Sequence, residues 1–152
     1  MNKKQVKSIV LILQLFLVGA LFLPAGIVEA PNKKVTYLSV FGMIDRYAGM
    51  GFSDDARFFM IFACFFPAVI LFSVFFLKER LNFGMATILS AFYSAATACF
   101  FSAAKTKMVD YATVTILPYV IVAVSILTLM IEILGFFYTA PGSSDQEKDK
   151  KK

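Results

Sequence analysis

The most informative absence from this 152-residue sequence is histidine, which does not occur at all. Without histidine, the chain cannot supply a Ser–His triad, a histidine general base or a histidine ligand to zinc, copper or haem. Cysteine occurs only twice, at Cys64 and Cys99, and both residues lie within apolar runs. We therefore predict no disulfide framework, and we interpret both cysteines as small, buried apolar side chains.

Charge is also scarce, because only 16% of the residues are Asp, Glu, Lys or Arg, whereas soluble chains average about a quarter. Four long apolar runs fill most of the sequence, and together they contain one charged residue, Glu132. The runs are Ile9–Val28, Phe58–Leu77, Phe83–Ala104 and Tyr111–Tyr138. About 20 apolar residues are enough to cross a hydrocarbon core roughly 30 Å thick. The sequence therefore predicts an all-α membrane protein, a four-transmembrane-helix antiparallel bundle, with spans at about 8–29, 54–78, 83–104 and 110–139.

These spans form a single membrane domain over residues 1–142, followed by a charged tail at 143–152 that we predict to be disordered. The basic start and the first apolar run also fit a secretory signal peptide cleaved after Ala30. However, the run exceeds the roughly 7–15 apolar residues of such signals, and Pro31 would directly follow the cut. We therefore favour a retained first span.

The predicted outer loop, residues 30–53, contains one patterned segment, Leu38–Ala48. Its large apolar residues recur every three positions, which favours a short amphipathic helix at the membrane interface. Val35–Val40 is also β-prone, so a short strand is the alternative. After the loop, Ser53 has the residue type of a helix N-cap, and the two aspartates that follow it suit a helix start. The repeating apolar residues are Leu38, Phe41, Ile44 and Tyr47.

The third span carries a row of small residues at every fourth position, and Asn82 before it has the residue type of an N-cap. Small residues at this spacing let helices approach closely in lipid, which predicts that the third span is the central packing helix. Phenylalanine side chains of the second span are expected to fill the space beside it. The small row is Ala86, Ser90, Ser94, Ala98 and Ser102, and the phenylalanine row is Phe58, Phe62, Phe65, Phe72 and Phe76.

Glu132 is the candidate functional residue, because an ionisable side chain inside a span is costly unless it has a role. It lies six residues before Tyr138, which is roughly 9 Å at about 1.5 Å per residue. Ser125, Thr128 and Gly135 share its helix face, and lipid offers polar groups no partner, so we predict that this face points into the bundle. The same depth arithmetic predicts one polar layer on the cytoplasmic half, in which Glu132 accepts hydrogen bonds from some of Gln14, Ser73, Thr87 and Ser90.

No residue pattern indicates an enzyme, so we expect no catalytic, cofactor-binding or metal-binding residue. Nucleic-acid binding is not expected either, because the basic residues lie in connectors and at the termini. We interpret the chain as a non-enzymatic accessory or structural subunit of a membrane assembly, in which Glu132 pins helices together. The alternative is a small oligomeric transporter or channel with Glu132 lining or gating the path. The expected partners are the lipid bilayer and either further copies of the chain or another membrane protein.

Lysine and arginine counts predict the orientation, because short cytoplasmic loops are enriched in these residues. With both termini cytoplasmic, nine basic residues lie inside and six outside, so we predict a multi-pass protein of the cell (inner) membrane with the 30–53 loop outside. The inner set is Lys3, Lys4, Lys7, Lys78, Arg80, Lys148, Lys150, Lys151 and Lys152, and the outer set is Lys33, Lys34, Arg46, Arg57, Lys105 and Lys107.

Two short motifs accompany this architecture. Phe22-Leu23-Pro24 closes the first span, and Ser39-Val40-Phe41-Gly42-Met43-Ile44 follows in the outer loop, before three closely spaced spans. In this arrangement the chain resembles uncharacterised small four-span membrane proteins of Gram-positive bacteria. The resemblance covers most of the chain and implies a bacterial membrane protein, but it implies no activity and no functional residues.

Overall fold

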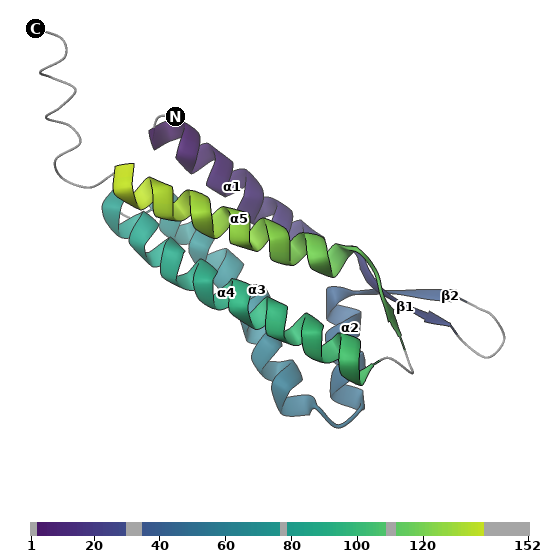
Figure 1. Ribbon diagram of the computed structural model, residues 1–152. Helices are drawn as coiled ribbons and strands as arrows, with labels where there is room; N and C mark the ends of the chain where they lie inside the picture. Colours follow the sequence, from purple (N-terminus) through teal and green to yellow (C-terminus); the bar gives the residue numbers. More distant parts are fainter. Residues whose placement is uncertain (1–2, 30–34, 77–78, 109–111, 139–152) are drawn as a thin grey trace, which may run out of the picture.

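Five helices and three short strands make up the computed structural model, which describes residues 3–29, 35–76, 79–108 and 112–138 (Figure 1). The predicted tail at 143–152 lies outside the described residues. In chain order the elements are α1 (Lys3–Ala20), β1 (Pro24–Glu29), β2 (Val35–Ser39), α2 (Val40–Gly49), α3 (Ser53–Phe76), α4 (Glu79–Lys107), β3 (Thr113–Val114) and α5 (Leu117–Tyr138).

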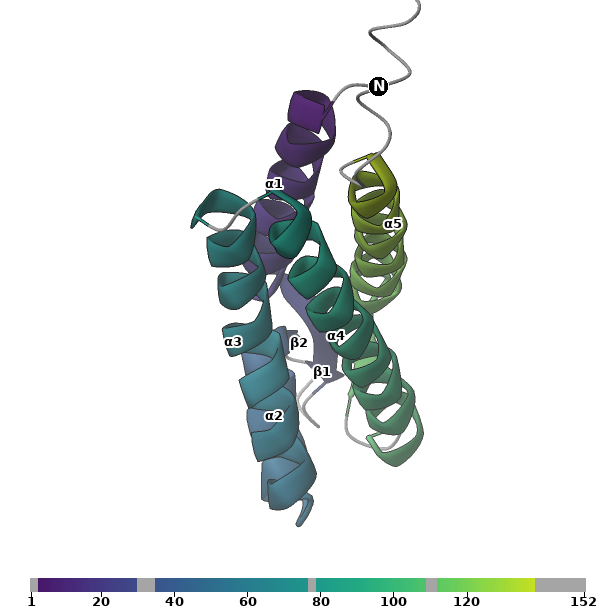
Figure 2. The same cartoon turned by 90° about the vertical axis from the view of Figure 1, so that its left-hand side faces the viewer.

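Helices α1, α3, α4 and α5 form an antiparallel four-helix bundle (Figures 1 and 2). Helix α4 packs between α3 and α5, and α1 packs against the same two helices from the other side, so α1 and α4 face each other across the bundle. The start of α1 and the end of α5 lie at one end, and the strands lie at the other (Figure 1). A four-helix arrangement of this kind gives every helix two antiparallel neighbours.

Three helices are long and apolar enough to cross a membrane, namely Ser53–Phe76, Leu81–Lys107 and Leu117–Phe137. Helix α1 differs from them because it has 18 residues, or about 27 Å at 1.5 Å per residue, and three of its first five residues are lysines. The prediction of a mostly helical chain with long apolar helices is therefore confirmed, with three helices of membrane length among the described residues.

The predicted first span, 8–29, is wrong in its second half, because α1 ends at Ala20 and the chain then forms β1 from Pro24. Pro24 has no N–H to continue a helix, and the β-branched pair Ile27 and Val28 favours a strand. The predicted fourth span, 110–139, also begins too early. Residues 113–114 form β3, and the helix starts at Leu117, with Pro118 in its first turn where proline is tolerated.

The strands form an antiparallel sheet of order β2-β1-β3, with β1 in the centre. Ile27 pairs with Tyr37 on one side and with Thr113 on the other, and a register shift lies between Pro24 and Gly26. The Thr115 amide donates to the Ala25 carbonyl over 3.0 Å, which continues the junction toward α5. The sheet therefore ties the connector after α1 to the connector before α5. Neither β1 nor β3 was anticipated from the sequence.

The alternatives for the outer loop are both realised, because β2 covers the β-prone residues and α2 follows it directly. Ser39 is the N-cap of α2, and its Oγ accepts a hydrogen bond from the Gly42 amide at 3.2 Å. The predicted apolar face, with a spacing of three, is wrong in part. A spacing of three drifts by about 60° per step around a helix, whereas positions i, i+3, i+4 and i+7 stay together. The buried residues of α2 accordingly are Val40, Met43, Ile44 and Tyr47.

Asn82, near the α3–α4 turn, does not have the predicted role of a helix N-cap. Asn82 was predicted to cap the third span, but α4 begins at Glu79, so Asn82 lies inside the helix. Its Nδ2 instead donates to the Val74 carbonyl at 3.5 Å, near the end of α3. The buried amide therefore joins two antiparallel neighbours rather than starting one of them.

The small-residue row does not form one packing surface. Ala86, Ser90 and Ser94 are buried, but Ala98 and Ser102 are exposed, because a spacing of four drifts by about 40° per step around a helix. Cys99, predicted as buried, is exposed because it lies beside Ala98 on the outward side of α4. Most of the buried residues of α4 alternate three and four positions apart, the period of coiled-coil-like bundle packing. They run through Phe83, Ala86, Ser90, Tyr93, Thr97, Phe100 and Ala104.

The phenylalanine row of the second span faces away from the bundle. Phe58, Phe65, Phe72 and Phe76 are all more than half exposed, so they do not fill space beside α4. The buried aromatic of α3 is instead Phe59, which continues the seam through Ala56 and Ala63. The outward faces of the three membrane-length helices therefore carry large apolar side chains.

Candidate functional site

The polar cluster, which we define as Gln14, Ser90 and Glu132, lies inside the bundle. Gln14 comes from α1, Ser90 from α4 and Glu132 from α5, so three of the four helices contribute one residue each. Their exposed fractions are 1%, 2% and 0%. The predicted inward face of α5 is confirmed, because Ser125, Thr128, Glu132 and Gly135 are all buried.

One amide joins the three helices. Gln14 Nε2 donates to Glu132 Oε1 at 3.4 Å and to Ser90 Oγ at 3.4 Å. Both amide distances exceed the usual range of about 2.7–3.2 Å, so each bond is individually weak. Because the groups are buried, the larger effect is the cost of leaving any one of them without its partner.

Two of the predicted layer residues do not join the cluster. The Ser73 hydroxyl donates to the Val69 carbonyl at 2.8 Å, and the Thr87 hydroxyl donates to the Phe83 carbonyl at 2.6 Å. Both bonds stay within the residue's own helix, four positions back, which is the usual way for a serine or threonine to satisfy its donor in an apolar environment. Ser73 is buried nevertheless, whereas Thr87 is partly exposed.

Further hydroxyl groups line the interior of the bundle, and sequence reasoning missed Thr97 and interpreted Ser94 only as a helix-packing residue. Thr97 and Thr128 donate to the Tyr93 and Val124 carbonyls at 2.6 and 2.7 Å. Both threonines are at most 1% exposed. The three-four spacing that runs through Ser90 and Thr97 is the signal that would have found Thr97, because it marks the inward face of α4.

Two oxygens of the cluster have no hydrogen-bond partner among the described protein atoms, namely Gln14 Oε1 and Glu132 Oε2. Ser94 Oγ, one turn along α4 from Ser90, also has no hydrogen-bond partner among these atoms. All three atoms can accept a hydrogen bond, and the Ser94 hydroxyl can also donate one. A carboxyl oxygen and an amide oxygen can also bind a hard cation. The interior beside the cluster is therefore rich in acceptors.

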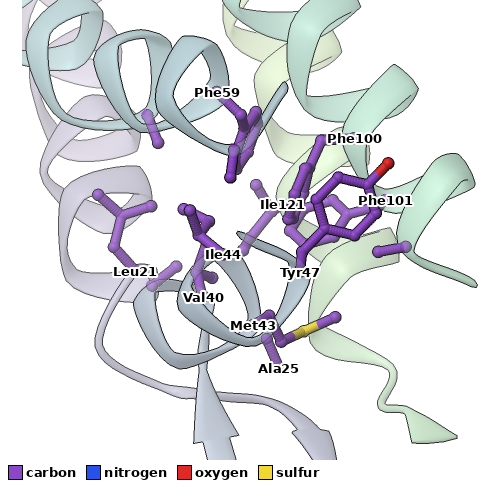
Figure 3. Close-up of a cluster of buried hydrophobic side chains, with 14 of the residues drawn as sticks. Leu21, Ala25, Val40, Met43, Ile44, Tyr47, Phe59, Phe100, Phe101 and Ile121 are labelled. Carbon is purple, nitrogen blue, oxygen red and sulfur yellow. The ribbon is translucent and has the colours of Figure 1, made fainter. Parts of the chain in front are cut away.

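An aromatic cluster, defined as Tyr47, Phe59, Phe100 and Phe101, fills the half of the bundle that faces the sheet (Figure 3). The Phe59 and Phe100 rings stack with centroids 3.9 Å apart, and Tyr47 meets Phe100 edge-on at 5.5 Å. Figure 3 shows Ile121 of α5 among these rings and Ile44 of α2 nearby. Apolar side chains from α2, α3, α4 and α5 thus fill the space between the polar cluster and the sheet.

Among the described residues, no group of three or more His, Cys, Asp or Glu side chains lies together as a metal site would require. Two acidic side chains at the start of α3 form exposed ion pairs, Asp54 with Arg57 at 4.0 Å and Asp55 with Lys107 at 3.9 Å. These pairs contribute little stability because water screens them.

Comparison with known proteins gives no match to a family model, to a curated protein or to a solved structure.

Proposed function

We propose that the chain is a four-span inner-membrane protein, with α1 as the fourth span, both termini cytoplasmic, and the sheet and α2 outside. The packing of α1 against α3 and α5 supports this proposal, because α1 lies alongside two helices of membrane length. Lys3, Lys4 and Lys7 then sit at the cytoplasmic surface, as the enrichment of basic residues on that side requires. The resemblance to four-span proteins of Gram-positive bacteria agrees with a bacterial cell membrane.

We propose further that the protein is a non-enzymatic accessory or structural subunit of a membrane assembly. The observation that carries this proposal is the bond from Gln14 to Glu132, which uses the single charged residue of the four apolar runs as a partner for another helix. The aromatic cluster supports it too, because it fills the interior beside the sheet. Large apolar side chains on the outward faces of α3, α4 and α5 are then available to lipid and to neighbouring spans.

Two substitutions of Glu132 separate the structural role from an ionisable role. Glu132→Gln keeps an oxygen that accepts from Gln14 and adds a donor for the free Gln14 Oε1. We expect this variant to retain wild-type thermal stability in mild detergent. Glu132→Leu removes the acceptor and leaves the Gln14 amide buried without a partner, which costs about 1–3 kcal/mol. We expect a lower unfolding temperature and weaker recovery of co-purifying membrane proteins.

Met130→Leu is the matched control, because Met130 is on the outward face of α5 and the change preserves its apolar character. It should leave both readouts unchanged. The structural proposal fails if Glu132→Gln loses stability and partners as severely as Glu132→Leu, since only the ionisable group would then explain the loss.

The second candidate is a small oligomeric transporter or channel with Glu132 on its path. The observation that favours it is the unpartnered pair Gln14 Oε1 and Glu132 Oε2 in the interior. This function requires self-association, because aromatic side chains fill the sheet half of a single bundle. Reconstituted protein should then carry a proton or cation flux that Glu132→Gln abolishes, and unchanged flux in that variant excludes the transporter.

A further inference from the structure

A groove of about 470 Å³ lies between α4 and α5 on the outer surface of the bundle, at the end nearest the sheet. Ala98 and Lys105 lie along its α4 side, and Tyr119 and Ile126 along its α5 side. Phe101 and Pro118 are buried and form its floor. The groove does not contain any residue of the polar cluster, so it is a separate feature of the molecule.

The groove exists because small side chains stand where bulky ones line most of the outward surface. Ala98 and Ala123 flank it, and both are exposed. It runs from Ala98 to Lys105 along α4, seven residues or about 10 Å at 1.5 Å per residue. A groove of that length, open along its outer side, matches the length of part of an extended hydrocarbon chain rather than the shape of a compact solute.

The polar groups of the groove are concentrated at one end. Lys105 is the only charged residue among the described residues that line it, and its Nζ lies 5.7 Å from the centroid of the Tyr119 ring. Ser102 lies one turn before Lys105. Because Lys105 is in the last turn of α4 and Tyr119 in the first turn of α5, this polar end sits where the spans leave the hydrocarbon core.

We propose that this groove binds one phospholipid with an anionic headgroup, from the leaflet on the side of the sheet. The phosphate lies against the Lys105 ammonium and the Tyr119 hydroxyl, and one acyl chain lies over Phe101 and Val122 toward Ile126. Charge complementarity carries the choice of lipid, because the described residues that line the groove include one cation, Lys105, and no anion. Lysine and tyrosine at this depth are the residues that anchor proteins to headgroups.

Lys107 provides a matched control for Lys105. It has the same charge and lies two residues further along, but its Nζ is 3.9 Å from Asp55 Oδ2 and 3.9 Å from the centroid of the Phe52 ring. Lys107 therefore points toward α3 and lies outside the lining of the groove. Removing its charge changes the net charge of the protein by the same amount without changing the groove.

The test is native mass spectrometry of the full chain, purified in mild detergent and titrated with phosphatidylglycerol or with phosphatidylcholine of the same acyl chains. We expect one bound lipid and a preference for phosphatidylglycerol. Lys105→Gln should reduce that preference about fivefold, which corresponds to ~1 kcal/mol for one lysine at an anionic membrane surface. Lys107→Gln should preserve it. Ala123→Leu, which fills the groove, should weaken binding of both lipids, and glycerol phosphate should not displace either lipid.

The proposal is overturned if Lys105→Gln leaves the preference unchanged, or if Lys107→Gln reduces it equally. It is also overturned if Ala123→Leu does not weaken lipid binding, which Ala98→Leu on the opposite wall checks independently. Displacement by glycerol phosphate alone would identify a soluble phosphate site instead. If Ala123→Leu instead converts a dimer into a monomer, a helix of a second copy occupies the groove.

Discussion

Two glycines at the α4–α5 interface, Gly84 and Gly135, each lie against a phenylalanine ring of the other helix. The absence of a side chain on the glycine leaves room for that ring. A Cβ on Gly135 would lie 2.6 Å from Cε1 and 2.7 Å from Cδ1 of the buried Phe83 ring. On the opposite helix, a Cβ on Gly84 would lie 3.5 Å from Cε2 of Phe136, an ordinary contact. Each helix thus sets one glycine against a phenylalanine of the other helix. Of these two glycines, only Gly135 has no room for a side chain.

We predict that Gly135→Ala destabilises the protein by about 1–3 kcal/mol, because the added methyl group would overlap a ring that has little room to move. Thermal unfolding in mild detergent measures the effect. Gly84→Ala is the control from the same interface and should be neutral or slightly stabilising, since alanine favours a helix over glycine. Equal destabilisation by both substitutions would contradict the predicted difference.

At the scale of elements, the spacing of buried residues along each helix determines which of its residues lie inside the bundle. Along α5, burial falls on Pro118, Ile121, Ser125, Thr128 and Glu132, again with steps of three and four. Residues on this seam stay on one face as the helices wind about each other, whereas residues four apart drift off it. The seam places Glu132 opposite Gln14, and the drift leaves Ala98 exposed beside the α4–α5 groove.

The boundary between β2 and α2 depends on one N-cap residue, Ser39. Ser39→Ala removes the oxygen that accepts from the Gly42 amide and should cost about 0.5–2 kcal/mol, chiefly in α2. Hydrogen exchange should speed up in α2 and remain unchanged in the membrane-length helices. Ser102→Ala is the control, because Ser102 is exposed in α4 and only its carbonyl accepts a bond, from Thr106. Equal exchange changes in the two variants would argue against a local capping role.

On the scale of the whole molecule, the up-and-down bundle brings both ends of the described chain to one end and the whole sheet to the other (Figure 1). The sheet joins segments that are distant in sequence, since Gly26 of β1 pairs with Val114 of β3. Loop closure over such a separation is costly, so the strand pairing depends on the bundle to bring the two connectors together. The bundle and the sheet therefore stabilise each other.

The third prediction tests the orientation of this whole arrangement. In a background with Cys64 and Cys99 replaced by serine, Tyr37→Cys lies on the exposed surface of β2 and Lys4→Cys near the start of α1. A membrane-impermeant maleimide should label Tyr37→Cys in intact cells and Lys4→Cys only after permeabilisation. The reverse pattern would place the sheet in the cytoplasm.

The sequence by itself determined the helices of membrane length and the inward face of α5, because uninterrupted apolar length and a polar stripe are local properties of the chain. It also determined that Glu132 has no charged partner within the four apolar runs, because these runs contain no other charged residue. It misplaced the end of the first helix, because apolar composition alone does not separate a helix from the strand that starts at Pro24.

Only the tertiary structure decided which polar residues meet and which surfaces remain outside. Gln14 reaches both Ser90 and Glu132 because three helices present these positions to one interior, whereas Ser73 and Thr87, at similar depth, bond within their own helices. Depth along a helix can be counted from sequence, but rotation about its axis is set by packing against neighbours. The same rotation buried Phe59 and exposed Phe58, and it left the α4–α5 groove open beside Lys105.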